Sequence, residues 1–119
     1  MDDWPSMATK LSGDLRTLRG GAPEVMKGFR ALAQAALKAD ALNTKTKELI
    51  ALAIAVATRC DDCITFHAEA AMKEGASRAE VLETMGMAIY MGAGPSVMYA
   101  AHAVAAFDQF SAKAVAQAA

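Results

Sequence analysis

The apolar residues of this 119-residue chain recur at helical spacing, and no segment alternates with the two-residue period of a strand. Glycine and proline interrupt the helical pattern at residues 20–23, at Gly75 and at residues 92–95. Breaks of this kind are typical of helix ends, because glycine adopts the backbone conformation that closes a helix and proline cannot continue one. The sequence therefore predicts an all-α fold of about six helices joined by short loops.

Capping residues indicate where several of these helices begin and end. Asn43 or Thr44 suits the first position of a third helix, and Gly75 suits the end of a fourth. Ser77 and Glu80 have the spacing of a capping box, in which each side chain binds a free backbone N–H of the other. We expect helices over residues 7–18, 23–38, 45–58, 60–75, 77–91 and 95–114.

The apolar positions of these helices suggest how they are buried. The second helix carries an apolar stripe that includes Phe29 and Leu32, and the third is apolar on all sides over residues 49–57. We expect the third helix to be fully enclosed and Glu48, the last charge before it, to be partly buried. The stripe predicted to be buried on the fifth helix comprises Val81, Leu82, Met85, Ala88 and Ile89.

The composition favours self-association. Hydrophobic residues make up 55% of this short chain, which is more than one small domain normally encloses. We expect a homo-oligomer in which copies of the chain cover part of each other's apolar surface.

Charge and hydropathy bear on nucleic-acid and membrane partners. A net charge of −1 without a Lys/Arg cluster predicts no nucleic-acid binding. The start, Met-Asp-Asp-Trp-Pro, lacks the basic flank and apolar run of a signal peptide, so a cytoplasmic location is the default expectation.

Residues 84–107 lack Asp, Glu, Lys and Arg and are long enough to span a bilayer. Gly92, Gly94 and Pro95 interrupt them, so two buried helices, and no membrane segment, are the better interpretation.

Both cysteines and one of the two histidines lie within residues 60–67. On a helix, Cys60 and Cys63 share a face with Cα atoms about 5–6 Å apart, within the range that a disulfide accepts. His67 stands one turn beyond Cys63, where an imidazole can accept a thiol proton. This arrangement predicts a redox dithiol with its own base.

The predicted helix start also affects the chemistry of these thiols. Free backbone N–H groups and the helix dipole favour a thiolate there, and His67 can deprotonate Cys63 or stabilise its thiolate. Asp61 and Asp62 oppose this, because a neighbouring negative charge raises the pKa of a thiol. Both are also good first-turn residues, which is a purely structural reason for their presence.

The two cysteines also have other interpretations. They can be small buried hydrophobic residues, or they can bind zinc together with His67 and His102. The C-x2-C-x3-H spacing is not that of a zinc finger, and we expect neither a metal nor a cofactor. A thioredoxin domain places its C-x-x-C in a βαβ context that this chain lacks.

A family resemblance adds to this. Glu48, Cys60-x-x-Cys63-x-x-x-His67, the Gly-Ala-Ser-x-x-Glu turn and the Met-Gly-x-Gly-Pro break together resemble the AhpD-like (alkylhydroperoxidase D-like) group of the carboxymuconolactone decarboxylase family. The resemblance covers about residues 22–110. It implies an AhpD-like helical domain over residues 22–119, preceded by an N-terminal helical extension over residues 1–21. It also implies assembly into trimers or hexamers with the site near subunit contacts.

The resemblance implies a thiol-dependent peroxidase or disulfide reductase. By position, Cys63 resembles the peroxide-reacting cysteine, Cys60 the resolving cysteine, and His67 and Glu48 a proton-relay pair. The implied partners are a peroxide and a dithiol donor such as a lipoyl or thioredoxin-like protein. Two-repeat AhpD proteins carry a histidine immediately before the second cysteine, where this chain has Asp62. That departure weakens the expectation of full peroxidase strength, but not of dithiol chemistry.

Two other functions stay open. One is a decarboxylase or lactone-handling enzyme, as elsewhere in the family, although those relatives do not depend on a C-x-x-C pair. The other is a non-enzymatic redox sensor whose disulfide alters its assembly.

Several residues also have structural interpretations. In a plain helical hairpin, Glu48 lies opposite residues near Met72, and its alternative role is that of a solvated first-turn carboxylate. His102, on an otherwise apolar helix, is interpreted as a core or interface histidine in preference to a residue of a substrate pocket. Core packing is likewise favoured over a pocket lining for Met85, Met87, Met91 and Met98.

Overall fold

The computed structural model describes residues 3–118 of the chain, and within this range it contains helices and no strand. The predicted all-α class is confirmed. Residues 1, 2 and 119, which the predicted ranges 1–21 and 22–119 include, lie outside the described part, and the division into those ranges stays a prediction. The helices are α1 (Trp4–Gly21), α2 (Pro23–Leu37), α3 (Thr44–Ala57), α4 (Asp61–Lys73) and α5 (Arg78–Ala118).

The last element, α5, comprises the two helices predicted on either side of residues 92–95. Its backbone leaves the helical conformation at Ala93, where φ is 59° and ψ is −150°, and Pro95 follows inside the helix. Proline lacks the N–H of a helical hydrogen bond and collides with the preceding turn, so it bends a helix. The predicted break at residues 92–95 is therefore confirmed as the kink where two helical segments meet, and the described elements number five because both segments carry the label α5.

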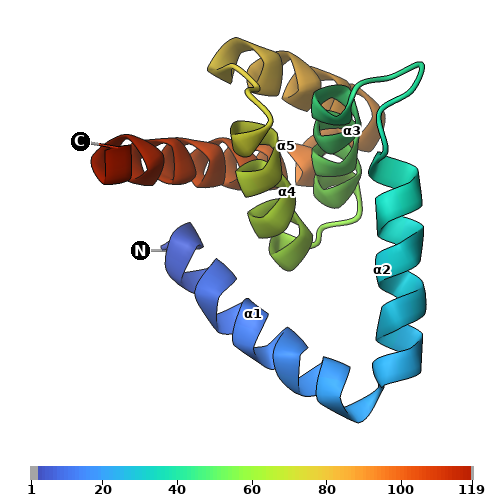
Figure 1. The fold of residues 1–119 in the computed structure, drawn as a ribbon. Coiled ribbons are helices and arrows are strands. Elements are labelled where there is room, and N and C mark those ends of the chain that lie inside the picture. Colours follow the sequence, from blue (N-terminus) through green and yellow to red (C-terminus); the bar gives the residue numbers. More distant parts are fainter. Residues whose placement is uncertain (1–2, 119) are drawn as a thin grey trace.

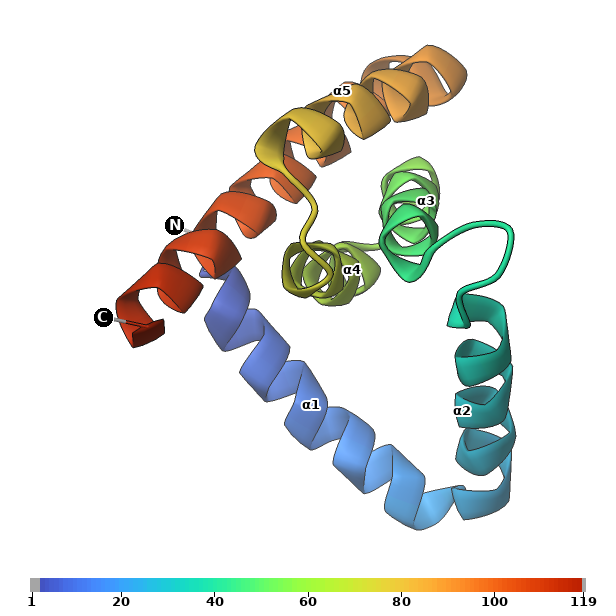
Figure 2. The same cartoon turned by 45° about the horizontal axis from the view of Figure 1, so that its top comes forward.

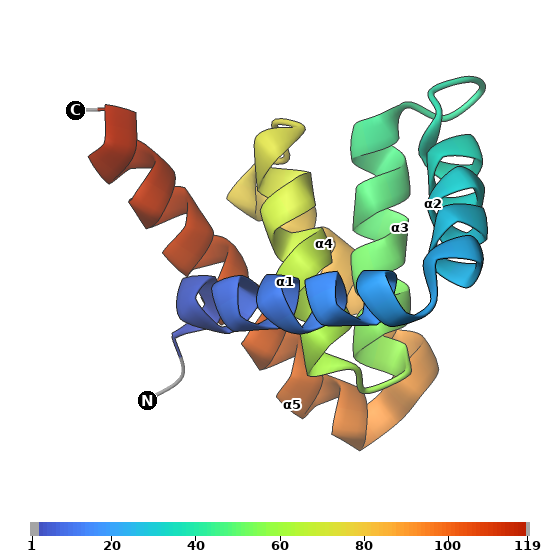
Figure 3. The ribbon, with the colours of Figure 1, turned by 60° about the horizontal axis from the view of Figure 1, so that its bottom comes forward.

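The kinked α5 lies along one side of the pair α3 and α4, which pack side by side (Figure 2). The core forms where these three helices meet, and its larger fully buried side chains include Leu52, Val56, Ile64, Val81 and Phe110. Helix α1 crosses the bundle (Figure 3). It is held at its start by buried Trp4, whose backbone N–H donates to Gln109 Oε1 at 2.8 Å. The start of α1 and the second half of α5 therefore lie against each other, on the side of the molecule where N and C are marked (Figure 1).

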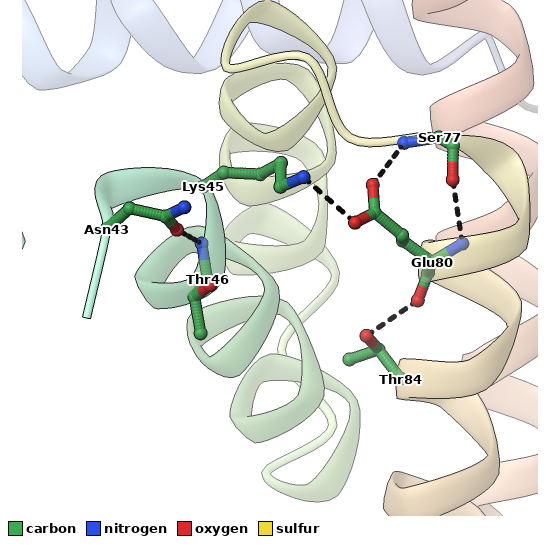
Figure 4. A network of polar contacts seen from close by, with 6 residues as sticks. All are labelled: Asn43, Lys45, Thr46, Ser77, Glu80 and Thr84. Carbon is green, nitrogen blue, oxygen red and sulfur yellow. Dashed lines mark hydrogen bonds and ion pairs between the residues drawn. The ribbon is translucent and has the colours of Figure 1, made fainter.

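Two predicted caps are confirmed at one end of the bundle (Figure 4). Asn43 Oδ1 accepts from Thr46 N at 2.8 Å, and Ser77 and Glu80 form the reciprocal capping box at 2.8 and 3.1 Å. Lys45 Nζ also binds Glu80 Oε2 at 2.9 Å, which ties the start of α3 to the start of α5. This lysine, followed by the Ser77 backbone N–H, lowers the pKa of Glu80. Glu80 therefore stabilises the fold at neutral pH, and acid removes that contribution as the carboxylate takes up a proton.

The burial of three apolar segments differs from the prediction. Helix α2 has no buried residue, and Phe29 on its apolar stripe is 62% exposed. Helix α3 is not fully enclosed, because Ile50 and Ile54 are exposed, the latter to 56%. Leu82, predicted in the buried stripe of α5, is exposed as well, whereas Val81, Met85 and Ala88 are buried. Helix α2 stands at the edge of the molecule (Figures 1 and 2) and, among the described helices, contacts only α1 and α3, which leaves its own apolar stripe uncovered.

None of the described helices combines the length and the apolar character needed to cross a membrane. Residues 84–107 are helical on both sides of the break, as predicted, but they are only partly buried, because Met87, Tyr90 and Met98 are exposed.

Candidate active site

A tight turn between α3 and α4 positions the first cysteine. Arg59 N donates to Val56 O at 3.1 Å, and Cys60 N donates to Ala55 O at 3.0 Å. This is the hydrogen-bond pattern of a Schellman motif, which closes a helix with one residue in the left-handed region. Arg59 is that residue, with a φ of 59°. Because arginine seldom adopts this conformation, the sequence gives no sign of the turn.

Cys60 then becomes the N-cap of α4, and Cys63 stands in its first turn. The Cys60 Sγ accepts a hydrogen bond from Cys63 N at 3.2 Å, in the way that an N-cap side chain binds a free helix N–H. The two Cα atoms are 5.2 Å apart, and the two sulfur atoms are joined in a disulfide. The pair thus lies where backbone N–H groups and the helix dipole favour negative charge on sulfur.

His67, one turn further along α4, contacts Glu48 of α3. The distance from His67 Nδ1 to Glu48 Oε1 is 2.7 Å. The Glu48 side chain is only 8% exposed, so its alternative role as a solvated first-turn carboxylate is wrong. An ionised carboxylate can only accept hydrogen bonds, so Nδ1 carries the proton in this contact. The other ring nitrogen, Nε2, is then the one available to exchange a proton with a thiol or substrate.

A hollow of about 230 Å³ opens beside these groups. Its lining is mostly aliphatic on the α3 side and carries a sulfur atom and an imidazole on the α4 side. The lining residues are Ala51, Ile54, Ala55, Thr58, Cys63 and His67. Cys63 and the histidine base therefore share one small cavity, whereas Cys60 is not among the residues that line it.

A second histidine contacts the same turn of α4 from another helix. His102 Nδ1, on α5, lies 2.9 Å from Asp61 Oδ1, and both side chains are half-buried. The ring also contacts Trp4 and Tyr99, with centroids 5.6 and 5.2 Å apart. The sequence indicated that His102 lies on an apolar helix but gave no indication of Asp61 as its partner.

The remaining candidates lie elsewhere. Met85 is in the core, as predicted, whereas Met87, Met91 and Met98 are exposed and none of the four lines the hollow. Across residues 3–118, the His, Cys, Asp and Glu side chains form no group of three or more that can hold a metal ion.

Comparison with known proteins now bears on this site. Residues 23–106 match the sequence pattern of the carboxymuconolactone decarboxylase family. The chain belongs to this family. The matched segment contains α3, α4 and the kink of α5. It therefore includes all four predicted site residues and both histidine–carboxylate contacts.

Relatives in the family share both sequence and fold with this chain. A carboxymuconolactone decarboxylase family protein from Legionella pneumophila, solved as the apo form, is 51% identical, with a TM-score of 0.90 over 93% of this chain and 99% of that one. Another from Thermotoga maritima, a candidate for involvement in the antioxidative response, is 28% identical, with a TM-score of 0.77 over 87% of this chain and 88% of that one. An uncharacterised protein of Cupriavidus necator is 36% identical over 92% of this chain and 97% of its own length.

Proposed function

We propose that the protein is a cofactor-free thiol peroxidase and disulfide oxidoreductase whose redox centre is the Cys60–Cys63 pair. The observation that carries this proposal is the shared cavity of Cys63 and His67, with Glu48 binding the far side of the imidazole. A nucleophile, a base and a group that orients the base are the three parts of an activated nucleophile. The disulfide partner, Cys60, stands one helical turn away at the N-cap.

In the oxidative half-reaction, the reduced Cys63 loses its proton to His67 Nε2 and attacks one oxygen of a hydroperoxide. The O–O bond breaks, the departing alkoxide or hydroxide takes up a proton, and Cys63 becomes a sulfenic acid. The Cys60 thiolate then attacks the Cys63 sulfur and displaces hydroxide, which leaves as water. The products are an alcohol or water, a second water, and the disulfide seen in the structure.

In the reductive half-reaction, a dithiol donor restores the two thiols. One donor thiolate attacks Cys60 Sγ, and Cys63 leaves with the electron pair of the S–S bond. The second donor thiol then attacks the donor sulfur of this mixed disulfide and releases Cys60 as a thiolate. We expect a lipoyl or thioredoxin-like protein to be this donor, in the cytoplasm, where such dithiols are kept reduced. The antioxidative connection of the Thermotoga relative agrees with this cycle.

Thiol titration tests the proposal directly. The reduced chain is expected to show two free thiols, because it contains two cysteines, and to lose both after one equivalent of hydrogen peroxide or of an alkyl hydroperoxide. A dithiol added afterwards is expected to restore both. Consumption of neither thiol at micromolar peroxide within minutes would contradict the proposal.

We further propose that the protein works as a homo-oligomer, a trimer or hexamer, assembled through its uncovered apolar face. Phe29, Leu32 and Val25 form an exposed stripe on α2, and Ile50 and Ile54 add exposed apolar area on α3. Exposed apolar clusters of this kind mark interaction surfaces in proteins that are otherwise well folded. Because Ile54 also lines the hollow beside Cys63, a neighbouring copy would close the cavity from that side.

A charge placed on this face is expected to prevent assembly. Phe29→Glu would bury an unpaired carboxylate between subunits and weaken association by at least about 100-fold, which shows as a shift to monomer mass in light scattering coupled to gel filtration. Lys27→Glu, on the same helix and also exposed, is the matched control and is expected to leave the mass unchanged. Even a weak complex, with a dissociation constant of about 100 μM, is partly assembled when the chain itself is at about 100 μM. A wild-type chain that is monomeric at that concentration would therefore exclude the oligomer.

A further inference from the structure

The contact between His102 and Asp61 has no part in the reaction described above. Asp61 follows Cys60 directly and is the first helical residue of α4. Its carboxylate is thus carried by the residue next to the one whose sulfur must leave and attack as a thiolate, since consecutive Cα atoms lie about 3.8 Å apart. A bare negative charge at this place disfavours a second negative charge on Cys60.

His102 contacts this carboxylate from the side of α5. The Nδ1 atom lies 2.9 Å from Asp61 Oδ1, which is hydrogen-bond distance, and the ionised carboxylate can only accept. The ring is kept in place by Trp4 of α1 at 5.6 Å and by Tyr99 of its own helix at 5.2 Å. Three helices thus converge on one imidazole that donates to the carboxylate next to Cys60.

The other charged groups near this turn were considered as alternatives. The neighbouring carboxylate, Asp62, is exposed and interacts with Lys10 of α1. The pKa of Lys10 is raised mainly by its hydrogen bond to Asp14, and the negative charge of Asp62 adds a smaller effect. Arg59 precedes Cys60 and is also exposed, so water screens its charge. Within residues 3–118, His102 is the side chain that the structure shows bonded to the carboxylate of Asp61.

We propose that His102 is a positioning residue for the dithiol: its hydrogen bond to Asp61 shields Cys60 from the negative charge of that carboxylate and keeps Cys60 reactive in thiol exchange. This inference rests on the proposed function, because it assigns the exchange half-reaction to a second histidine–carboxylate pair. Glu48–His67 then serves Cys63 and the peroxide, while Asp61–His102 serves Cys60 and the dithiol donor. Low basicity of the leaving thiol speeds thiol exchange, so the benefit appears when Cys60 is released from the donor.

The test uses a chain in which Cys60 is the sole thiol, because Cys63→Ser leaves one cysteine. The rate of alkylation by iodoacetamide is measured against pH, with and without a change at His102. His102→Phe keeps an aromatic ring against Trp4 and Tyr99 but cannot donate to Asp61. It is expected to slow alkylation at neutral pH by about three- to tenfold and to move the midpoint of the pH profile upward, since thiolate fraction sets the rate.

His102→Gln distinguishes the charge effect from packing. Glutamine loses the ring contacts but keeps an N–H that can donate to Asp61, so its rate is expected to lie between those of the phenylalanine variant and the reference. A packing role predicts the opposite order, with phenylalanine tolerated and glutamine impaired, and that order would overturn the proposal. The Cys63 thiol, measured in a Cys60→Ser chain, is expected to be unaffected by His102→Phe, and an equal loss there would also overturn it.

Asp61→Asn provides a second, independent variant in case the His102 variants do not fold. Without the carboxylate, Cys60 is expected to react at least as fast as in the reference chain, and His102→Phe is expected to have no further effect. A slower Cys60 in Asp61→Asn would refute the charge argument. Alkylation needs no peroxide, so these results are independent of whether peroxidase activity is found.

Discussion

Replacing Cys63 with serine is expected to abolish catalytic peroxide consumption, a loss of at least about a thousandfold, as when the nucleophile of an enzyme is removed. Cys63 is the sulfur that lines the hollow with His67, and a serine hydroxyl at this position cannot be oxidised to a sulfenic acid. The peroxide that remains is measured with a colorimetric assay over time, with a dithiol as the reductant.

Cys60→Ser is the matched control, because it removes the other sulfur of the disulfide and keeps the one in the cavity. Without added dithiol, this variant is expected to consume one equivalent of peroxide and to stop at the sulfenic acid, since it has no neighbouring thiol with which to condense. A reagent that traps sulfenic acids is expected to label Cys60→Ser and not Cys63→Ser. The reverse labelling would exchange the roles of the two cysteines, and full peroxide turnover by Cys63→Ser would exclude this mechanism. Turnover of a carboxylated lactone by the double Cys→Ser variant would favour the lactone-handling alternative.

The site shows where residue patterns carry structural information and where they do not. Local features were predictable: the Asn43 cap, the Ser77–Glu80 capping box and the placement of Cys60 and Cys63 one turn apart are all confirmed, because each depends on residues within one turn of each other. The break near Ala93 is also as predicted, but the sequence does not state the angle at which the two helical segments meet. Whether a helix stops or bends at proline depends on what packs around it, which the local sequence does not state.

Contacts between helices are harder to predict from the sequence. The residues alone place Glu48 opposite Met72, and only the family resemblance relates it to His67; the structure brings the two side chains to 2.7 Å. The reason is the turn at Arg59, where an unexpected left-handed residue redirects the chain as it leaves α3. The partnership of Asp61 and His102 spans 41 positions and was not anticipated, since nothing local to either residue records the packing of α5 on α4.

Burial was misjudged where a pattern does not distinguish an internal core from an interface. The apolar sides of α2 and α3 look alike in sequence to the buried side of α5, yet Phe29 and Ile54 are exposed in the single chain whereas Val81 is buried. An apolar stripe states only that a surface avoids water, not which molecule covers it. This difference is why the exposed stripe supports the proposed homo-oligomer.

Glu48 and His67 are expected to act as one unit in the oxidation of Cys63. His67→Gln removes the base and is expected to slow the reaction of reduced enzyme with peroxide by about 100-fold, the usual size of a general-base effect. Glu48→Gln keeps an oxygen that can accept from Nδ1 but loses the negative charge, so a smaller loss of about tenfold is expected. Stopped-flow fluorescence or thiol quenching on the reduced chain measures this step without the donor.

The double variant decides whether Glu48 works through His67. Because the carboxylate contacts the imidazole at 2.7 Å, its removal should matter little once the imidazole is gone. The double variant is therefore expected to be no slower than His67→Gln alone, whereas independent roles would multiply the two losses. Glu69→Gln is the control. Glu69 is on α4, like His67, but its carboxylate pairs with Lys73 at 3.6 Å. The variant is expected to react with peroxide at the wild-type rate. Multiplied losses in the double variant would contradict this, because they would mean that Glu48 acts independently of His67, for example by supporting the structure of α3 and α4. A comparable loss in Glu69→Gln would contradict it as well, because the effect would then not be specific to the carboxylate that contacts the imidazole.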